Sequence, residues 1–570
     1  MINAQVADIF RSIAQLLEIK GDNPFRIRAY ARAADRIAAM QEDIAAYARE
    51  GRLEELEGVG KDLAAKIGEI IATGTCRHYE EIKKSVPQGV VDMLAVPGIG
   101  PKTAKLFYDE LDIRSISALR RAAQQGRLKG LPGVQQKTVE NILEGIALVE
   151  KGQERMDILT AGRVATAVAD GLKDFKSVKS IGPAGSLRRG RETVRDIDIL
   201  AASLRPAEVM EKFVSLPFVK RVLAHGATKS AVLTDEDIQV DLRVLAPRAF
   251  GAALLYFTGS KAHNIKLRQL AVRKKLKINE YGLFDMKEAC LASRTEAEIY
   301  AALGMDFIPP ELREDRGEIE AALAHRLPRL VELRDIRGDF HAHTNYSDGR
   351  HTPEEMAAAA QRLGYEYLCL TDHSVSLKVA RGLDRKRLKE KKAHLDKLNK
   401  KLKGFRVLFA TEAEIDAEGR IDYPSDLLRT FDVVVAAIHS GFRQSREQLT
   451  RRIVRACQNP DVHIIAHPTG RQWPGRPSYD VDFEEIFKAA RETNTALEIN
   501  AQPARMDLGD GLARAAKEAG VRLAVGTDAH DRAHLAYMPF GVGLARRAWL
   551  EKKDLLNTQP LERLLQTIEK

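Results

Sequence analysis

The stretch that decides the fold is GSLRRGRETVRDIDILAAS, residues 185–203. It opens with a small-residue turn that carries two arginines and continues into a run in which apolar and acidic residues alternate. Because successive side chains of a strand point to opposite faces, we expect Asp196 and Asp198 on one face, about 7 Å apart along the backbone. A second alternating run, VDLRVL at 240–245, supplies Asp241. The sequence therefore predicts an α+β region that gathers three carboxylates.

Three carboxylates on neighbouring strands suit two hard cations such as Mg²⁺, which prefer oxygen ligands. Two such ions lower the pKa of a 3′-hydroxyl, hold it in line with an α-phosphorus, and neutralise charge on departing pyrophosphate. We expect Ser186 and Arg189, in the turn, to hold the triphosphate. An isolated Asp-x-Asp pair is most often a solvated strand edge. The GSxRRG turn ahead of it favours nucleotidyl transfer instead.

The downstream segment YFTGS, residues 256–260, is followed by Asn264, Arg268 and INEY at 278–281. In this order and spacing, the chain resembles the nucleotidyltransferase superfamily and, more narrowly, DNA polymerase beta and the other family X polymerases. The resemblance implies that the three aspartates are catalytic and bind two Mg²⁺, with Asp241 drawing the proton from the primer hydroxyl. It implies that Arg268 touches the template strand. The nucleotide-binding residues that it implies are Ser186, Arg189, Tyr256, Phe257, Gly259 and Asn264.

Two arginines near the turn qualify this resemblance. Arg155 stands where the family has another triphosphate arginine, although little of the sequence around it matches. Arg195 stands where the family commonly has glycine beside the first catalytic aspartate. We therefore expect nucleotide affinity or metal preference to differ from the family pattern.

Residues 1–150 have the pattern of short amphipathic helices broken by glycine-containing turns. The turns GVGK at 58–61 and GIGPK at 98–102 resemble helix-hairpin-helix elements, in which glycine lets backbone N–H groups approach a phosphate closely. Such contacts tolerate any sequence and weaken with salt. The DNA-binding residues predicted here and in the preceding region are Gly58, Gly60, Gly98, Gly100, Lys66 and Arg268.

By the same resemblance, Lys66 aligns with the family's Schiff-base lysine, which removes a 5′-deoxyribose phosphate. Asp62 and His78 occupy positions where the family has lysines around the 5′-phosphate. An acid there would repel that phosphate. Whether Lys66 supports a lyase reaction stays open at this stage.

Beyond residue 337, short apolar runs alternate with helical stretches, which predicts an α/β barrel-like region. Histidines or acids stand where the expected strands end, and their nitrogen and oxygen donors suit two or three Mn²⁺ or Zn²⁺ ions. Glu414 is an alternative to Glu412 as the acidic ligand, and Arg443 and Arg505 are possible phosphate holders. The predicted ligands are His341, His343, Asp348, His373, Glu412, His439, His467, Asp528 and His530.

This ligand series resembles the polymerase and histidinol phosphatase (PHP) domain, which implies hydrolysis of a phosphodiester or phosphomonoester by metal-activated water. Together the two resemblances cover nearly the whole chain. They predict an all-α helix-hairpin-helix N-terminal region, an α+β nucleotidyltransferase palm and thumb, and a C-terminal distorted α/β barrel. The expected domains are 1–85 (helical, like the 8 kDa domain), 86–152 (helix-hairpin-helix fingers), 153–245 (palm), 246–315 (thumb), 316–336 (linker) and 337–570 (PHP).

The implied function is gap-filling DNA synthesis in repair, with dNTPs as substrates and gapped or primed duplex DNA as the partner. The PHP domain is expected to add metal-dependent 3′–5′ exonuclease activity or other 3′-end processing, which includes cleavage at abasic sites. One alternative is a small-molecule phosphoesterase fused to a DNA-binding module. Another is a template-independent nucleotidyltransferase. The YFTGS segment, Asn264 and Arg268 speak against the first, and the two helix-hairpin-helix turns against the second.

Chain length, net charge, apolar runs and cysteine content limit these hypotheses. The 570 residues exceed what one hydrophobic core supports, and a formal charge of +10 favours a polyanionic partner. No apolar run of membrane-spanning length and no signal peptide occurs, so we expect a cytoplasmic protein, with a monomer as the default. Four scattered cysteines without a CxxC pair indicate neither a disulfide framework nor a cysteine zinc site.

Overall fold

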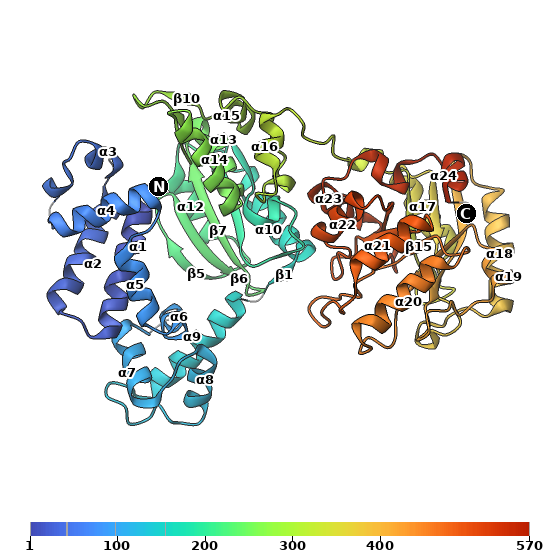
Figure 1. The fold of residues 1–570 in the computed structure, drawn as a ribbon, viewed down its shortest axis with the longest axis horizontal. Coiled ribbons are helices and arrows are strands. Elements are labelled where there is room, and N and C mark those ends of the chain that lie inside the picture. The colour runs from blue at the N-terminus through green and yellow to red at the C-terminus, as the bar shows by residue number, and fades with distance from the viewer. Residues whose placement is uncertain (1, 41–43, 57, 97–98, 154, 569–570) are drawn as a thin grey trace. The chain divides into compact units, whose positions relative to one another are not determined.

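A computed structural model describes residues 2–40, 44–56, 58–96, 99–153 and 155–568. The chain divides into two compact units, Met1–Glu154 and Arg155–Lys570 (Figure 1). None of the described helices is both long enough and apolar enough to cross a membrane.

The first unit is all-α. Its core is formed by the apolar faces of amphipathic helices, with Phe10 of α1 meeting Tyr30 of α2 edge to face at 5.3 Å. Asn23 caps α2 with its side chain, ahead of a proline at the first helical position, as helix N-termini favour. The helices are α1 (Ile2–Lys20), α2 (Pro24–Ala39), α3 (Ile44–Arg49), α4 (Lys61–Thr73), α5 (Arg77–Ser85), α6 (Gln88–Asp92), α7 (Pro101–Leu111), α8 (Ile116–Gln124) and α9 (Gln136–Gln153).

The second unit begins with a five-stranded sheet of order β2-β4-β7-β6-β5, in which β4 and β7 run parallel. Apolar residues of α10 (Ile158–Lys173) and α12 (Pro206–Val214) form one core with the sheet. A short turn of helix, α11 (Gly185–Arg188), and the small strand pair β1 (Met156–Asp157) and β3 (Thr193–Val194) lie beside it. The sheet strands are β2 (Ser180–Pro183), β4 (Ile197–Ala202), β5 (Val219–His225), β6 (Lys229–Thr234) and β7 (Gln239–Leu245).

Residues 250–323 surround a separate small core. Its three-stranded antiparallel sheet has the order β10-β9-β8. A capping box of Thr295 and Glu298 begins α15. The elements are α13 (Phe250–Thr258), α14 (Lys261–Arg273), β8 (Lys277–Asn279), β9 (Gly282–Phe284), β10 (Cys290–Ala292), α15 (Glu296–Ala302) and α16 (Glu318–Leu323).

The C-terminal region is a seven-stranded parallel sheet in strict chain order, β11 to β17. A parallel bridge joins Ala342 to Ala529, so the first and last strands meet and the sheet nearly closes into a barrel. The predicted distorted α/β barrel is therefore confirmed. Its strands are β11 (Gly338–Ala342), β12 (Tyr367–Leu370), β13 (Arg406–Glu414), β14 (Val433–Ala437), β15 (Ile464–Ile465), β16 (Ala496–Asn500) and β17 (Leu523–Gly526).

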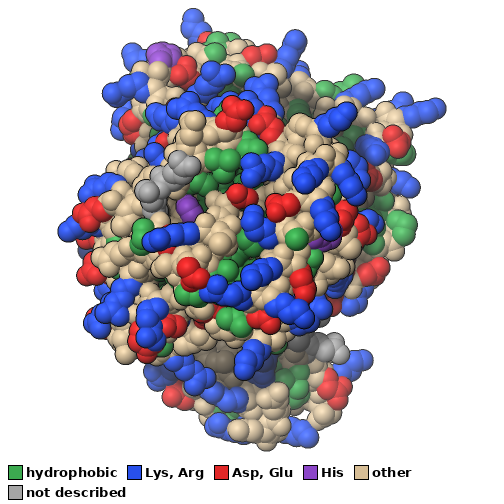
Figure 2. All heavy atoms as spheres, turned by 90° about the vertical axis from the view of Figure 1, so that its right-hand side faces the viewer, with side chains coloured by type: hydrophobic (Ala, Val, Ile, Leu, Met, Phe, Trp, Pro, Cys, Tyr) green, Lys and Arg blue, Asp and Glu red, His purple; other side chains and the backbone are tan. Residues whose placement is uncertain are grey.

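Helices cover this barrel, and their apolar faces share its core. Figure 2 looks onto this end of the second unit, where Lys and Arg side chains are spread over the face with Asp and Glu between them. The helices are α17 (Pro353–Arg362), α18 (Arg385–Asn399), α19 (Ser425–Leu428), α20 (Arg446–Gln458), α21 (Phe483–Glu492), α22 (Asp510–Glu518), α23 (Met538–Arg547) and α24 (Leu561–Ile568).

Candidate active sites

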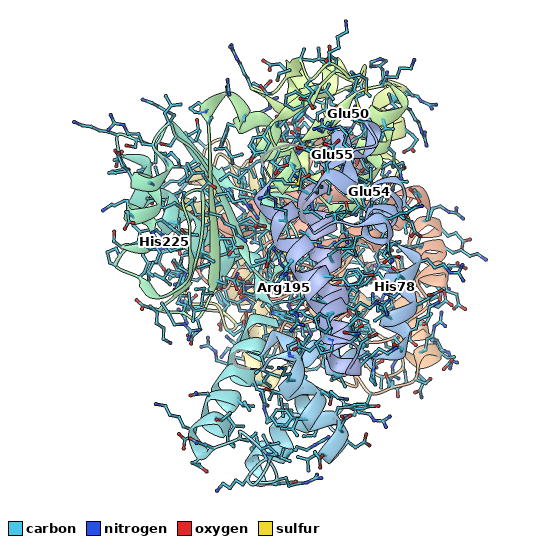
Figure 3. The ribbon with its side chains drawn as sticks, turned by 90° about the vertical axis from the view of Figure 1, so that its left-hand side faces the viewer. Glu50, Glu54, Glu55, His78, Arg195 and His225 are labelled. Atoms are coloured by element: carbon cyan, nitrogen blue, oxygen red, sulfur yellow. The ribbon has the colours of Figure 1, made fainter. Side chains whose placement is uncertain are left out.

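The three aspartates of the second unit meet at one end of two neighbouring strands. Asp198 of β4 stands directly opposite Asp241 of β7 in parallel register, and adjacent strands lie about 4.8 Å apart. Asp196 lies one residue before β4, outside the strand on which the sequence placed it. Gln239 donates to Asp241 at 3.0 Å, and Arg195, labelled in Figure 3, approaches Asp196 at 3.6 Å.

These carboxylates interact strongly with one another. Burial, together with the charges of Asp196 and Asp241, raises the pKa of Asp198 to about 6. Mutual repulsion among half-buried carboxylates is relieved when divalent cations bind between them. The trio therefore fits a site for hard metal ions such as Mg²⁺.

Burial of Asp198 and its repulsion by the other two aspartates predict a pH-dependent gain in stability for Asp198→Asn. The folded pKa, about 6, lies above the ordinary 3.8, so the penalty of ionising Asp198 is absent below pH 4 and complete above about pH 6. We expect the substitution to stabilise the metal-free protein at pH 8 by about 1–2 kcal/mol after allowance for solvent screening, or about 2–6 °C in melting temperature. Calorimetry at pH 8 and pH 4 measures it. An equal gain at both pH values would contradict the assigned repulsion.

The turn before β4 fits closely against Asp198. Gly185 has φ +58°, and a Cβ there would lie 2.2 Å from Oδ2 of Asp198, so both backbone angle and space demand glycine. The sequence analysis quoted this residue without assigning it a role. Beside the turn is an open cavity of about 340 Å³, lined by Arg155, Ser186, Arg189, Arg191, Arg195, Asp196 and Glu314. Four arginines around one hollow suit a polyphosphate.

Arg189 is held by residues 258 and 314, through contacts that the sequence did not indicate. Its Nε donates to Glu314 at 3.0 Å, and its Nη1 donates to the carbonyl of Thr258 at 2.6 Å. Neighbouring Arg188 forms a two-pronged ion pair with Glu296, at 2.8 and 2.6 Å. These partners lie 69 to 125 residues away in sequence, which no local motif reveals. They fix both arginines in the turn.

The YFTGS segment ends α13. Tyr256 and Phe257 meet edge to face at 5.0 Å, and Arg243 stacks over Phe257 at 4.5 Å. Asn264 donates to the carbonyl of Tyr256 at 2.7 Å. Gly259 takes φ +65°, which favours glycine. A small hollow is lined by Ala252, Leu255, Tyr256, Asn264, Leu267, Arg268, Ile278 and Asn279.

In the first unit, the predicted glycine turns begin helices. Gly60 is the N-cap of α4 and Gly100 that of α7, while Gly58 takes φ +83°. Gly98 lies outside the described residues. No described atom lies within 4 Å of a Cβ built at Gly58, Gly60 or Gly100, so internal packing does not account for these glycines. Exposed backbone N–H groups at a helix N-terminus are suited to a phosphate.

Lys66 of α4 is paired with Asp62 one turn before it, and its side chain is 14% exposed. Burial lowers the pKa of Lys66, but the hydrogen bond to Asp62 and the charge of Tyr30 outweigh it, and the net shift is upward. His78, labelled in Figure 3, lies 2.9 Å from Arg26 and stacks on Tyr30. A protonated lysine is a poor nucleophile.

We therefore expect little Schiff-base chemistry at neutral pH. Borohydride trapping on a duplex with a 5′-deoxyribose phosphate should give little cross-linked protein, and Asp62→Asn should raise the yield about three- to ten-fold, since one pKa unit changes the free amine tenfold. Lys66→Ala is the negative control. A high yield from the parent that Asp62→Asn does not change would refute this account.

The nine predicted ligands of the barrel are brought together at the carboxyl ends of its strands. Three tight groups occur among the described residues: His343 with Asp348, His373 and His530; His341 with His343 and Asp528; and His373 with Glu412 and His439. His467 completes the set through Glu412, at 2.8 Å. Glu412 lies between five histidines, whereas Glu414 accepts from Nδ1 of His439 at 2.8 Å. Glu412 is thus the central acid and Glu414 an orienting one.

The chemistry of this cluster fits metal ions. The buried nitrogens Nε2 of His341, both ring nitrogens of His343 and Nδ1 of His373 have no hydrogen-bond partner. Unpaired buried polar atoms are costly unless something binds them. Burial, together with the positive charges of His530 and His373, lowers the pKa of His343 to about 4, which leaves the neutral imidazole that metals require.

Supporting contacts orient the ligands. Glu498 accepts from Nδ1 of His341 at 2.7 Å, so the other nitrogen faces the cluster. His467 and Asp528 take φ +29° and +51°, strained backbone of the kind found at functional sites. Glu498 is not among the residues predicted from the sequence, because no local motif marks it.

The two candidate phosphate holders of the barrel differ. Nε of Arg505 lies 3.2 Å from Asp528, and its Nη1 is buried without a partner. Arg443 is exposed. Only Arg505 reaches the cluster.

Comparison with known proteins covers both units. Two family models match the first unit: the helix-hairpin-helix domain matches residues 1–76, and the SAM-like helix-hairpin-helix tandem matches residues 90–147. Two more match the second unit: the DNA polymerase beta thumb matches residues 253–314, and the PHP domain matches residues 339–502. "DNA polymerase/3′-5′ exonuclease PolX" of Bacillus subtilis (strain 168) is 39% identical over 565 residues, 99% of this chain and 98% of the relative.

Other relatives match the barrel region alone. A "Probable phosphatase" of Thermoanaerobacter sp. (strain X514) is 31% identical over 231 residues, 39% of this chain and 89% of the relative. Another, of Caldanaerobacter subterraneus subsp. tengcongensis, is 34% identical over 203 residues, 34% of this chain and 75% of the relative.

Proposed function

Because the chain belongs to the family X DNA polymerases that carry a PHP domain, we propose that it fills short gaps in duplex DNA with dNTPs and processes 3′ ends by metal-dependent hydrolysis. The observation that carries the polymerase assignment is the parallel register of Asp198 and Asp241 beside an arginine-lined cavity. The biological setting is base excision or break repair.

In this proposal, Asp196, Asp198 and Asp241 would hold two Mg²⁺, and these ions would supply neutralisation of charge on the reacting phosphates. Ser186 and Arg189 hold the triphosphate, and the rings of Tyr256 and Phe257 pack beside the sugar of the incoming nucleotide. Asn264, which already donates to the carbonyl of Tyr256, is positioned by the same segment. Asp241 accepts the proton of the primer hydroxyl.

The barrel cluster is the proposed site of 3′–5′ exonuclease activity, with two or three Mn²⁺ or Zn²⁺ held by the nine ligands. Bound metal supplies an activated water and a Lewis acid for a phosphodiester. Arg505, with its unpartnered Nη1, holds the phosphate. Cleavage at abasic sites is a further reaction of the same centre.

One experiment separates this proposal from its alternatives. Primer extension is measured on a gapped duplex and on an untemplated single-stranded end, with dNTPs and with rNTPs. We expect templated incorporation of dNTPs at the gap. Efficient extension of the untemplated end would favour a template-independent transferase, and no extension at all would favour a phosphoesterase with a DNA tether.

A further inference from the structure

The turn that lines the arginine-rich cavity is held in place from the PHP region, by which we mean the C-terminal barrel and its helices, residues 338–568. Arg547, the last residue of α23, is 2% exposed. Its Nη1 donates to the carbonyl of Arg189 at 2.8 Å, and its Nη2 donates to Asp510 at 2.5 Å. A buried guanidinium needs such partners, because an unpaired one costs several kcal/mol. The middle of the turn is therefore fixed by a residue 358 positions away.

The same arginine also reaches the side chain of Arg189 through a shared acid. Oε1 of Glu314 accepts from Nε of Arg189 at 3.0 Å and from Nη1 of Arg547 at 3.1 Å. Glu314 thus lies between the two guanidinium groups. Removing Arg547 would leave this oxygen of Glu314 paired with Arg189 alone, so that the carbonyl of Thr258 and a less restrained Glu314 would be the side-chain partners left to orient Arg189.

A second arginine of the PHP region holds the C-terminal end of the turn. Nη1 of Arg471 donates to Glu192 at 2.8 Å, and its Nε donates to the carbonyl of Arg505 at 2.8 Å. Thr193, the next residue, accepts from Nε of Arg155 at 2.6 Å, and Arg155 lines the cavity. Two residues before Arg189, Leu187 packs against the barrel core. The turn is thus anchored at three points.

We propose that Arg547 and Arg471 are positioning residues for the triphosphate of the incoming nucleotide, so that the PHP region forms part of the polymerase's nucleotide site. The inference rests on the proposed polymerase function. A turn held in its binding geometry does not lose conformational freedom when the nucleotide binds, and this preorganisation increases affinity. The PHP region then has two roles, hydrolysis at its own cluster and support of the turn at residues 185–192.

The chain offers a matched control next to Arg547. Arg546 also reaches across from α23, with its Nε donating to Glu311 at 2.7 Å and its Nη1 to the carbonyl of Val331 at 3.1 Å. Neither partner belongs to the turn or lines the cavity. Loss of Arg546 removes an ion pair of the same kind and leaves the turn intact.

The test measures single-nucleotide gap filling by the full-length parent, Arg547→Met, Glu192→Gln and Arg546→Met. We expect the KM for dNTP to rise about ten-fold in Arg547→Met and about three-fold in Glu192→Gln, with kcat within about three-fold, since ten-fold corresponds to one lost positioning contact. Arg546→Met should keep the parental KM. Mn²⁺-dependent hydrolysis of bis(p-nitrophenyl) phosphate reports whether the PHP region of each variant is folded.

Two results would overturn the inference: a KM within two-fold of the parent in both turn variants, or an equal rise in Arg546→Met. If Arg547→Met also loses hydrolysis, it has unfolded, and Glu192→Gln, whose side chain is 22% exposed, decides alone. A parent that extends no primer would instead refute the proposed polymerase function.

Discussion

Asp198→Asn is expected to abolish gap filling, with a loss of at least about 10³-fold in kcat/KM, while the protein becomes more stable. The substitution removes a carboxylate that faces Asp241 across the two parallel strands and that the proposed cations require. Loss of about 4 kcal/mol of transition-state stabilisation corresponds to that factor. Single-turnover extension of a gapped duplex measures it.

Asp235→Asn is the matched control, because Asp235 is an exposed aspartate of the same sheet region. It should retain parental extension. Substantial extension by Asp198→Asn in Mg²⁺ would mean that the trio is not the polymerase centre.

Glu412→Gln is expected to reduce Mn²⁺-dependent hydrolysis of a 3′-terminal phosphodiester by at least about 10³-fold. Glu412 is 1% exposed and lies within 3.5 Å of five histidines, so its loss removes the charge at the centre of the cluster. Release of labelled nucleotide from a primed duplex measures the effect. Extension in Mg²⁺ should stay near parental.

Glu418→Gln is the control, because Glu418 is exposed and lies a few residues further along the chain. This variant should hydrolyse the 3′-terminal phosphodiester at the parental rate. If Glu414→Gln proved far more damaging than Glu412→Gln, the assignment of the central acid would be reversed. Among the residues that the structure describes, Glu414 forms an ion pair with one histidine, His439, so a milder loss is expected from it.

Strands, helices and the barrel fold class could be predicted from the sequence, because short-range patterns of apolar and polar residues encode them. Period-two alternation placed Asp198 and Asp241 on strands, and alternating strands and helices predicted the parallel barrel, whose fold class is confirmed. Asp196 falls just before its strand because the alternation cannot show where strand pairing begins. The family resemblance is confirmed by a relative that spans nearly the whole chain.

Residues that act through distant partners could not be predicted in this way. Glu498 is 157 residues from the histidine that it orients, and Arg547 is 358 residues from the carbonyl that it binds. Neither stands in a motif, since an acid within a strand or an arginine at a helix end is ordinary in sequence. Only the tertiary fold gives such residues a role.

The most direct test of two separate chemistries compares three full-length proteins on a gapped duplex with dNTPs and Mn²⁺: the parent, Asp196→Ala with Asp198→Ala, and His341→Ala with His343→Ala. We predict that the first double variant loses extension and keeps 3′ degradation, and that the second does the reverse. Loss of both activities in either variant, or of neither, would contradict the assignment of polymerisation and hydrolysis to different centres.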